Sequence, residues 1–253
     1  MGPVGMGLVG MIRHPVLVGT AGWSVPKAVA DAFPGPGSHL ERYARALPAV
    51  EINTSFYRPH KPETYERWAA STPPGFRFAV KVPQAVTHVA RLRGAGEPLA
   101  RFLGEVAHLG GRLGPLLVQL PPSLAFDAAV AGAFLTDLRG RFSGDVVCEP
   151  RHRTWFTDAA ERLLVEHRVA RAAADPAPAP GADRPGGWDG LVYVRLHGSP
   201  EMYHSPYPPD ALVRIAGLLA ADAERCPAWC VFDNTALGHA TADALATMRL
   251  LND

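Results

Sequence analysis

The sequence predicts a mixed α/β protein built as a single TIM-like (β/α)8 barrel, and three observations support this. Eight short apolar runs with the composition of β-strands alternate with amphipathic stretches from residue 16 to the C-terminus. The chain of 253 residues has room for eight such units in one domain. Nearly every apolar run ends on a polar or ionisable residue, and such barrels carry their functional groups at that end of the strands. An open doubly wound sheet fits the repeating count less well.

The expected strands are short apolar runs, as is typical of parallel strands buried on both faces. They span residues 16–19, 50–52, 76–80, 116–120, 146–149, 169–174, 191–196 and 229–232. The sixth strand is inferred mainly from its position in the repeat. Together the eight runs predict a parallel sheet whose strands follow chain order.

Helix signals stand between these runs. Ser38 and Glu41 have the spacing of a capping box at the start of the first helix. Pro62 precedes the second helix, and Asp127 and Asp158 are expected to cap two later helices. Apolar residues at helical spacing predict the other helices, which lie at 102–109, 210–223 and 240–251.

One stretch interrupts the repeat. Residues 175–190, DPAPAPGADRPGGWDG, are too rich in proline and glycine to form a helix. We expect a mobile loop where the sixth helix of a regular barrel would lie. No glycine-rich phosphate-binding signature follows any expected strand, so no nucleotide cofactor is predicted.

Composition narrows the classes of partner. Lys and Arg number 25 against 24 Asp and Glu, and this balance disfavours nucleic acid. No apolar run approaches the roughly 18 residues of a membrane span, so we expect a cytoplasmic protein with no membrane partner. The cysteines, Cys148, Cys226 and Cys230, are expected to be reduced thiols.

The N-terminus is expected to stand apart from the barrel. Residues 1–15 form an apolar segment without the features of a signal peptide, and we expect a flexible extension. Residues 16–253 are expected to form the barrel domain. Met1, Met6 and Met11 are alternative starts.

Polar residues at the strand ends form the candidate site. Arg195 and His197 are two residues apart, so both project to one side of an extended strand, and Glu51 and Asn53 repeat this spacing. We therefore expect the polar residues to line the barrel mouth as a ligand site. The set comprises Glu51, Asn53, Lys81, Gln119, Glu149, Arg151, Arg195, His197, Asp233 and Asn234.

Several motifs occur in a familiar order from residue 16 to the C-terminus. They are GTAGW at 19–23, VEINTSFYRP at 50–59, FRFAVKVP at 76–83, LVQLPPS at 117–123, CEPRHRTWF at 148–156, YVRLHG at 193–198 and VFDNTALGHA at 231–240. Together they resemble the YecE-like family, also called domain of unknown function 72. The resemblance implies a TIM barrel with a pocket formed by these motifs, and it supplies no established reaction. Ala21 stands where this family more often has Ser.

The first functional hypothesis is a cofactor-free enzyme, such as a hydrolase, lyase or isomerase, for a small polar or anionic ligand. Glu51 and Glu149 are the candidate acid–base pair, and exchanging either for Gln is expected to remove turnover and leave the fold intact. His197 is a further catalytic candidate. Lys81 becomes a candidate Schiff-base nucleophile if burial or a neighbouring cation lowers its pKa.

The other side chains of the mouth are expected to bind the substrate. Lys81, Arg151 and Arg195, with His197, are expected to receive an anionic group. Aromatic walls are expected from Trp23, Tyr57 and Trp155. His88 and His152 are expected to support loops, His152 within the pocket wall.

Two alternatives stay open. A metal-dependent isomerase or nuclease would use hard ligands such as Glu51, Glu149 and His197, but Lys81 and Arg195 would repel the cation. We therefore expect no metal. A noncatalytic module that binds a metabolite or nucleic acid is the second alternative. Composition does not predict the oligomeric state.

Overall fold

The computed structural model describes residues 13–253 and shows a mixed α/β fold with two sheets. One sheet has the order β1-β10-β9-β7, and the other has the order β2-β3-β4-β5-β6-β8. The strand β8 pairs with β6 in antiparallel fashion, and the remaining pairings are parallel. The bounds are β1 Val16–Thr20, β2 Ala49–Ile52, β3 Arg77–Lys81, β4 Leu113–Gln119, β5 Val146–Glu149, β6 Val169–Arg171, β7 Ala173–Asp175, β8 Gly186–Gly187, β9 Val192–Leu196 and β10 Ala228–Phe232.

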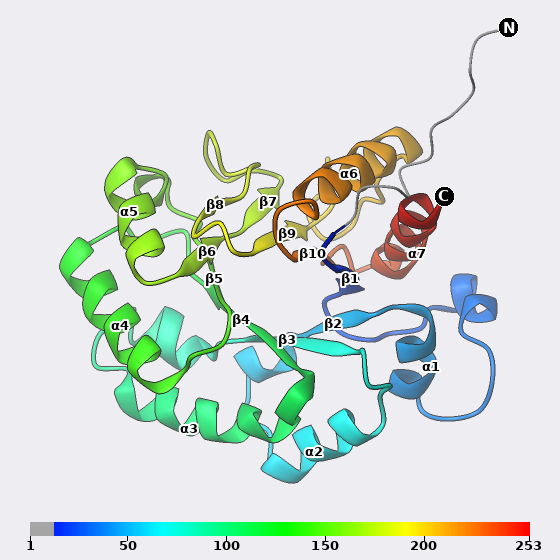
Figure 1. Cartoon of the computed structure of the whole chain (residues 1–253), viewed down its shortest axis with the longest axis horizontal. Coiled ribbons are helices and arrows are strands. Elements are labelled where there is room, and N and C mark those ends of the chain that lie inside the picture. Colours follow the sequence, from blue (N-terminus) through cyan, green and yellow to red (C-terminus); the bar gives the residue numbers. More distant parts are fainter. Residues whose placement is uncertain (1–12) are drawn as a thin grey trace, which may run out of the picture.

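The helices lie around the outside of the strands (Figure 1). The first six each lie between two successive strands of the parallel repeat, as the alternation in the sequence predicts, and α7 follows the last strand. Their bounds are α1 His39–Ala46, α2 Pro62–Ala70, α3 Gly96–Val106, α4 Ala128–Arg141, α5 Asp158–Glu166, α6 Pro209–Asp222 and α7 His239–Asn252.

The two sheets meet at two junctions. At the first, Ala21 and Glu51 form a parallel bridge, and the N–H of Gly22 donates to the Glu51 carbonyl at 2.9 Å. A Cβ at Gly19 would lie 2.1 Å from the Ala49 carbonyl oxygen, so β1 and β2 approach this closely because residue 19 is glycine. At the second junction, Ala172 alone separates β6 from β7, and these pair with β5 and β9 respectively.

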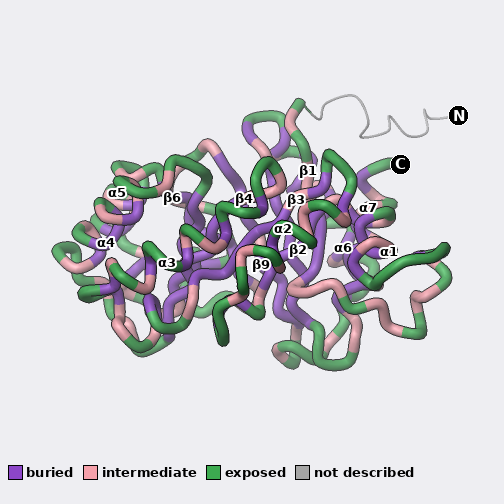
Figure 2. Tube along the Cα trace, turned by 90° about the horizontal axis from the view of Figure 1, so that it is seen from below, coloured by how far each residue is buried: buried purple, intermediate pink, exposed green. Residues whose placement is uncertain are grey.

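Alternation along the strands produces two separate apolar cores. The larger core lies between the sheets and the helices and includes Val50 and Phe78. The smaller core holds the opposite face of the same strands and includes Ala49, Ala79 and Tyr193. Figure 2 shows buried chain running through the middle of the molecule with exposed chain around it. The face that carries the smaller core is the one on which the polar residues of the strand ends lie.

Most element predictions are confirmed, but the helix predicted at 102–109 begins at Gly96, and the strand predicted at 169–174 is divided into β6 and β7. The capping box at α1 is present, with Ser38 N–H donating to the Glu41 carboxylate at 2.6 Å. Asp127 caps α4 by accepting from the N–H groups of Ala129 and Val130. The prediction that Asp158 caps α5 is wrong, because Thr157 occupies the N-cap position.

The loop that follows β7 contains no helix in the part spanning 176–190, as predicted. Instead Gly186–Gly187 pairs with β6, and the buried Arg171 guanidinium donates to the carbonyls of Gly181 and Arg184 at 3.3 and 3.2 Å. These contacts fix the loop against α5, where Glu161 also pairs with Arg171. The structure does not test the predicted mobility of the loop.

Arg13 and His14 are the first two residues that the structure describes. Both Arg13 and His14 donate a backbone N–H to the Ala223 carbonyl, just beyond α6. Of the predicted extension over 1–15, residues 1–12 lie outside the described part of the chain. Among residues 13–253, none of the helices combines the length and the hydrophobicity that crossing a membrane requires.

Candidate functional site

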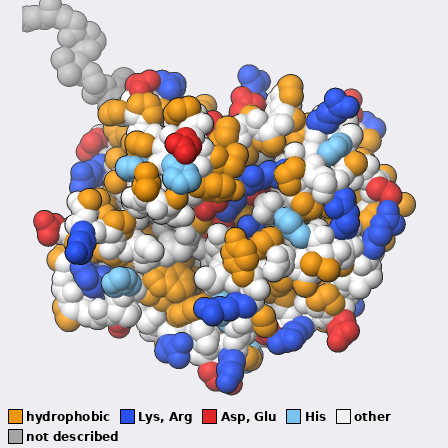
Figure 3. Space-filling view, turned by 180° about the vertical axis from the view of Figure 1, so that it is seen from behind, with side chains coloured by type: hydrophobic (Ala, Val, Ile, Leu, Met, Phe, Trp, Pro, Cys, Tyr) orange, Lys and Arg blue, Asp and Glu red, His pale blue; other side chains and the backbone are white. Residues whose placement is uncertain are grey.

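The inward-facing positions at the carboxyl ends of the strands carry ionisable side chains, although nearly all of these are buried. Apolar residues occupy the same face lower in the strands, so the polar set begins where the small core ends. Viewed from behind, the molecule has a central hollow in which basic and acidic side chains are visible together (Figure 3). The buried polar residues of this layer are Glu51, Lys81, Gln119, Glu149, Arg195, His197 and Asp233.

Arg195 is the centre of this layer. Its guanidinium is 1% exposed and binds Glu51 through two hydrogen bonds, from Nη2 to Oε1 at 2.7 Å and from Nε to Oε2 at 3.0 Å. Nη1 donates to Glu149 Oε2 at 2.9 Å, and Nη2 also contacts Asp233 Oδ2 at 3.1 Å. One arginine therefore joins carboxylates from the ends of β2, β5 and β10.

His197 and Arg151 complete the ion-pair network. His197 Nε2 lies 3.0 Å from Glu149 Oε1, and its Nδ1 lies 3.1 Å from Asp233 Oδ2. Arg151 Nη2 donates to the same Glu149 oxygen at 2.8 Å. The predicted pairing of Arg195 and His197 on one face of their strand is confirmed by these contacts.

Tyr193 belongs to the same network but was not predicted. Its hydroxyl donates to Glu51 Oε2 at 2.9 Å, so both Glu51 oxygens are occupied by donors. The signal that could have found it is the strand period, because Tyr193 lies two residues before Arg195 on the inward face. Tyr193 lies below the mouth, so it supports Glu51 and does not face a substrate.

Cations set the protonation of the network. Burial alone would raise the pKa of Glu149, but Arg195, Arg151 and the hydrogen bond from His197 hold that pKa well below its usual range. The pKa of Asp233 is lowered in the same way, with Arg195 again overcoming the effect of burial. Glu149 is therefore held as a carboxylate, which suits a counter-ion better than a general acid.

Lys81 lies at the same end of the strands but outside this network. Burial, and to a smaller extent the Arg195 cation, lower its pKa to about 8, because Glu51, Glu149 and Asp233 only partly oppose the shift. None of the ion pairs among residues 13–253 includes Lys81. Its ammonium group instead lies 4.1 Å from the centre of the Phe56 ring.

Beside the mouth, a cavity of about 390 Å³ follows the ends of β1 and β2. Trp23, Asn53 and Tyr57 line it, which places three predicted binding residues together. Tyr57 is 66% exposed, whereas Trp23 packs edge-to-face against Trp68. The Asn53 side-chain oxygen is buried and has no hydrogen-bond partner among the described residues.

Other predicted residues serve neighbouring loops. Gln119 donates to the Leu120 carbonyl at 3.0 Å, and His152 Nδ1 lies 2.9 Å from Thr154 Oγ1. Asn234 donates to Asp243 and to the Ser205 carbonyl, which ties the end of β10 to α7. These contacts hold the loops around the mouth.

Two aromatic-ring predictions have different outcomes. Trp155 is 2% exposed, donates its indole N–H to the Leu124 carbonyl and packs against Phe126, so its predicted place in the wall of the mouth is wrong. His88 contacts the Phe56 ring and lies 2.8 Å from Thr87 Oγ1, which agrees with its predicted support of a loop.

The geometry does not assemble a metal centre. Among residues 13–253, no group of three His, Cys, Asp or Glu side chains is arranged to hold a metal ion. The carboxylates of the mouth accept hydrogen bonds from Arg195 and Arg151 instead.

Buried Cys148 and Cys230 have raised thiol pKa values because burial disfavours the thiolate.

Comparisons with known proteins place this chain in a family. YecE of Escherichia coli strain K12, a UPF0759 protein, is 33% identical over 169 residues, which are 64% of this chain and 60% of YecE. The chain thus matches less than two thirds of that relative's length. A DUF72 family protein of Enterococcus faecalis V583 has a TM-score of 0.80 at 20% identity, covering 94% of this chain and 96% of its own.

A more distant structural neighbour is the D-psicose 3-epimerase of Clostridium cellulolyticum H10, solved with D-tagatose. Its TM-score is 0.52 at 11% identity, and the similarity covers 85% of this chain and 91% of the epimerase. At such identity the likeness concerns the fold alone. Residues 17–253 match the family described as protein of unknown function DUF72, and the chain therefore belongs to the DUF72 family.

Proposed function

We propose that the two sheets form one (β/α)8 barrel and that the chain is a small-molecule enzyme working at its carboxyl end. Strands neighbour one another in chain order across both junctions, at Ala21–Glu51 and at Ala172. The similarity to an epimerase with a TIM-barrel fold supports the same architecture. In such barrels the carboxyl ends of the strands are the usual place of catalysis.

The observation that carries the proposal is the state of Lys81. A buried amine with a pKa of about 8 and no carboxylate in ion-pair contact among the described residues is unusual for a structural lysine. Such an amine exchanges protons near neutral pH and can attack a carbonyl carbon. Lys81 is thus the group we assign to proton transfer or to a Schiff base.

The acidic residues receive a different role from the one their residue types suggest. Glu51 and Glu149 accept from Arg195 at both ends of its guanidinium, so they fix the network beside Lys81. His197, between Glu149 and Asp233, remains the candidate partner for acid–base chemistry. Acid–base catalysis is therefore still proposed at the mouth, but Lys81 and His197 carry it in place of Glu51 and Glu149.

The substrate class follows from charge and shape. At pH 7 a lysine with a pKa of about 8 is mostly protonated, and Lys81 and Arg151 both lie close enough to His88 to lower the pKa of that imidazole. We propose a small polar substrate with an anionic group. Part of this substrate would contact Trp23 and Tyr57 in the adjoining cavity. The proposed chemistry requires no cofactor.

Three lysines in the whole sequence make the proposal easy to test. The protein is incubated at pH 7.5 with glyoxylate, an anionic carbonyl compound, and sodium cyanoborohydride, and alkylation of each lysine is followed by peptide mass spectrometry. With a pKa of about 8, Lys81 has roughly a quarter of its amine deprotonated, against about 0.1% for an ordinary lysine. Alkylation of Lys81 at least about tenfold faster than that of exposed Lys27 and Lys61 is expected, and an equal or slower rate contradicts the proposal.

A further inference from the structure

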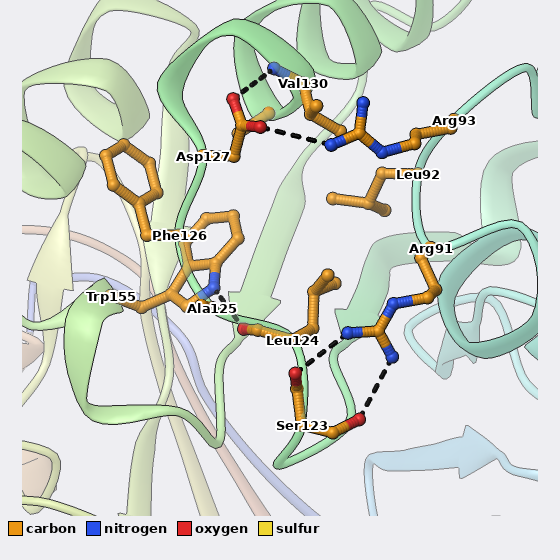
Figure 4. Close-up of a pocket in the computed structure, with 11 residues that line it drawn as sticks. Arg91, Leu92, Arg93, Ser123, Leu124, Ala125, Phe126, Asp127, Val130 and Trp155 are labelled. Carbon is orange, nitrogen blue, oxygen red and sulfur yellow. Dashed lines mark hydrogen bonds and ion pairs between the residues drawn. The ribbon is translucent and has the colours of Figure 1, made fainter.

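A second cavity lies away from the ion-pair network, between the loops that follow β3, β4 and β5. Its volume is about 280 Å³, near the lower end of the range for small-molecule sites. Figure 4 shows the side chains of three segments facing this space, including Arg91, Leu124 and Trp155. None of its lining residues belongs to the proposed catalytic layer.

The segment that carries the basic residues has an uncommon backbone. Arg91 and Leu92 both have positive φ angles, of 52° and 68°, a region that residues other than glycine rarely adopt. Leu92 is buried, and all three residues of this turn, Arg91, Leu92 and Arg93, line the cavity. Consecutive outliers of this kind justify a search for a function.

Arg91 brings a positive charge that no carboxylate neutralises. Its guanidinium donates to the Ser123 hydroxyl at 3.0 Å and to the Ser123 carbonyl at 2.8 Å, and among residues 13–253 it forms no ion pair (Figure 4). Neighbouring Arg93, by contrast, pairs with Asp127 at 3.1 Å. The further N–H donors of Arg91 remain available to an acceptor in the cavity.

The rest of the wall is apolar. Leu124, Val130, Ala131 and the ring of Trp155 line it, and the Trp155 N–H is already used by the Leu124 carbonyl at 2.9 Å. The start of α4 offers little to an anion, since Asp127 accepts from the N–H groups of its first turn. The cavity therefore combines the Arg91 guanidinium, which forms no ion pair among residues 13–253, with the Arg93–Asp127 pair and an apolar part of the wall.

We propose that this cavity is a binding site for a small amphipathic monoanion, whose carboxylate binds Arg91 and whose apolar body contacts Leu124, Val130 and Trp155. A guanidinium held by Ser123 presents a fixed set of donors, which suits a planar carboxylate. Arg91 is one of several cations in this region: burial lowers the pKa of His88, and Lys81, Arg151 and Arg91 lower it further. This site is independent of the chemistry assigned to Lys81.

Binding of phenylacetate, compared with its neutral analogue phenylacetamide, tests the proposal on the intact protein. Calorimetric titration should give at least about tenfold tighter binding for the acid, and NMR shifts should centre on the amides of Arg91 and Ala125. Arg91→Gln should weaken the binding of phenylacetate by about tenfold or more. Arg91→Lys should weaken it less because the charge remains. Arg58→Gln removes an exposed arginine elsewhere and should leave the affinity within about twofold.

Several outcomes overturn the site. Equal affinity for the acid and the amide removes the role of charge, and this comparison uses the wild-type chain, so it stands even if a variant fails to fold. Shifts confined to the mouth around Lys81 place the anion elsewhere. Unchanged binding by a folded Arg91→Gln protein, with melting like that of the wild type, excludes Arg91 as the receptor.

Discussion

Two buried cations at the carboxyl ends of the parallel strands have opposite surroundings. Arg195 lies among Glu51, Glu149 and Asp233, with donor–acceptor distances of 2.7 to 3.1 Å. Lys81 is 6% exposed and has no such partner, only the Phe56 ring at 4.1 Å. The carboxylates raise the pKa of Arg195 well above its usual value against the effect of burial, whereas burial lowers that of Lys81.

The difference separates structure from reactivity. A charge that is buried and fully paired is fixed, and breaking its pairs leaves other charges unsatisfied. A charge that is buried and unpaired is destabilising, and the protein retains it where a shifted pKa is useful. We therefore expect changes at Arg195 to act mainly on stability and changes at Lys81 to act mainly on reactivity.

Arg195→Met should have the largest effect on stability. It leaves the buried carboxylates of Glu51, Glu149 and Asp233 without their shared cation, and such a loss costs roughly 3–5 kcal/mol. Urea unfolding measures the change in the free energy of unfolding. Lys81→Met is the matched control and should cost less than half as much at pH 7. Equal losses in the two variants would remove the distinction between the cations.

Glu149→Gln should cost less, about 2 kcal/mol, because Arg195 keeps its bonds to Glu51 and Asp233. The sequence alone leads us to expect that Glu149→Gln removes turnover and leaves the fold intact. The ion-pair network adds the expectation that this variant is less stable than the wild type. Glu66→Gln, at an exposed carboxylate paired with His108, is the control and should change the stability by less than about 1 kcal/mol. A Glu149→Gln protein as stable as the wild type would show that the network is not a structural support.

The pH dependence of stability distinguishes the two cations further. The folded pKa of Lys81, about 8, lies below the value of 10.5 for a free lysine, so between these values the unfolded chain binds more protons. Wild-type stability should therefore rise relative to Lys81→Met by about 2 kcal/mol between pH 7 and pH 10. Buried Cys148 and Cys230 act in the opposite direction, but equally in both proteins. Parallel pH curves would contradict the shifted pKa.

Much of the fold could be predicted from local signals. Strand runs and the Ser38 capping box depend on residues close in sequence, and both are present in the structure. The strand period also brought Arg195 and His197 to one face. The prediction of Asp158 as the N-cap of α5 is wrong because Asp is common both at the N-cap and in the first turn of a helix. Thr157 holds the cap position here.

The pairing inside the site could not be predicted in the same way. Which carboxylate binds which cation depends on distances between the two sheets, from β2 and β5 to β9 and β10, and local spacing contains no such information. The depressed pKa of Lys81 needs the burial and the charges that surround it in three dimensions. Trp155 likewise looked like a mouth residue by position in the chain, and the packing of Phe126 places it in the core.

The most direct test of the central claim is the pKa of Lys81 itself. Because the sequence has three lysines, lysine labelled with ¹³C and ¹⁵N gives a spectrum in which exchange of Lys81 for Met assigns its signal, with exposed Lys27 and Lys61 as references. The side-chain carbon shift is followed from pH 6 to pH 11 in the wild-type protein. Titration of Lys81 near pH 8 is predicted. A midpoint at the ordinary value of about 10.4 or above would contradict the account.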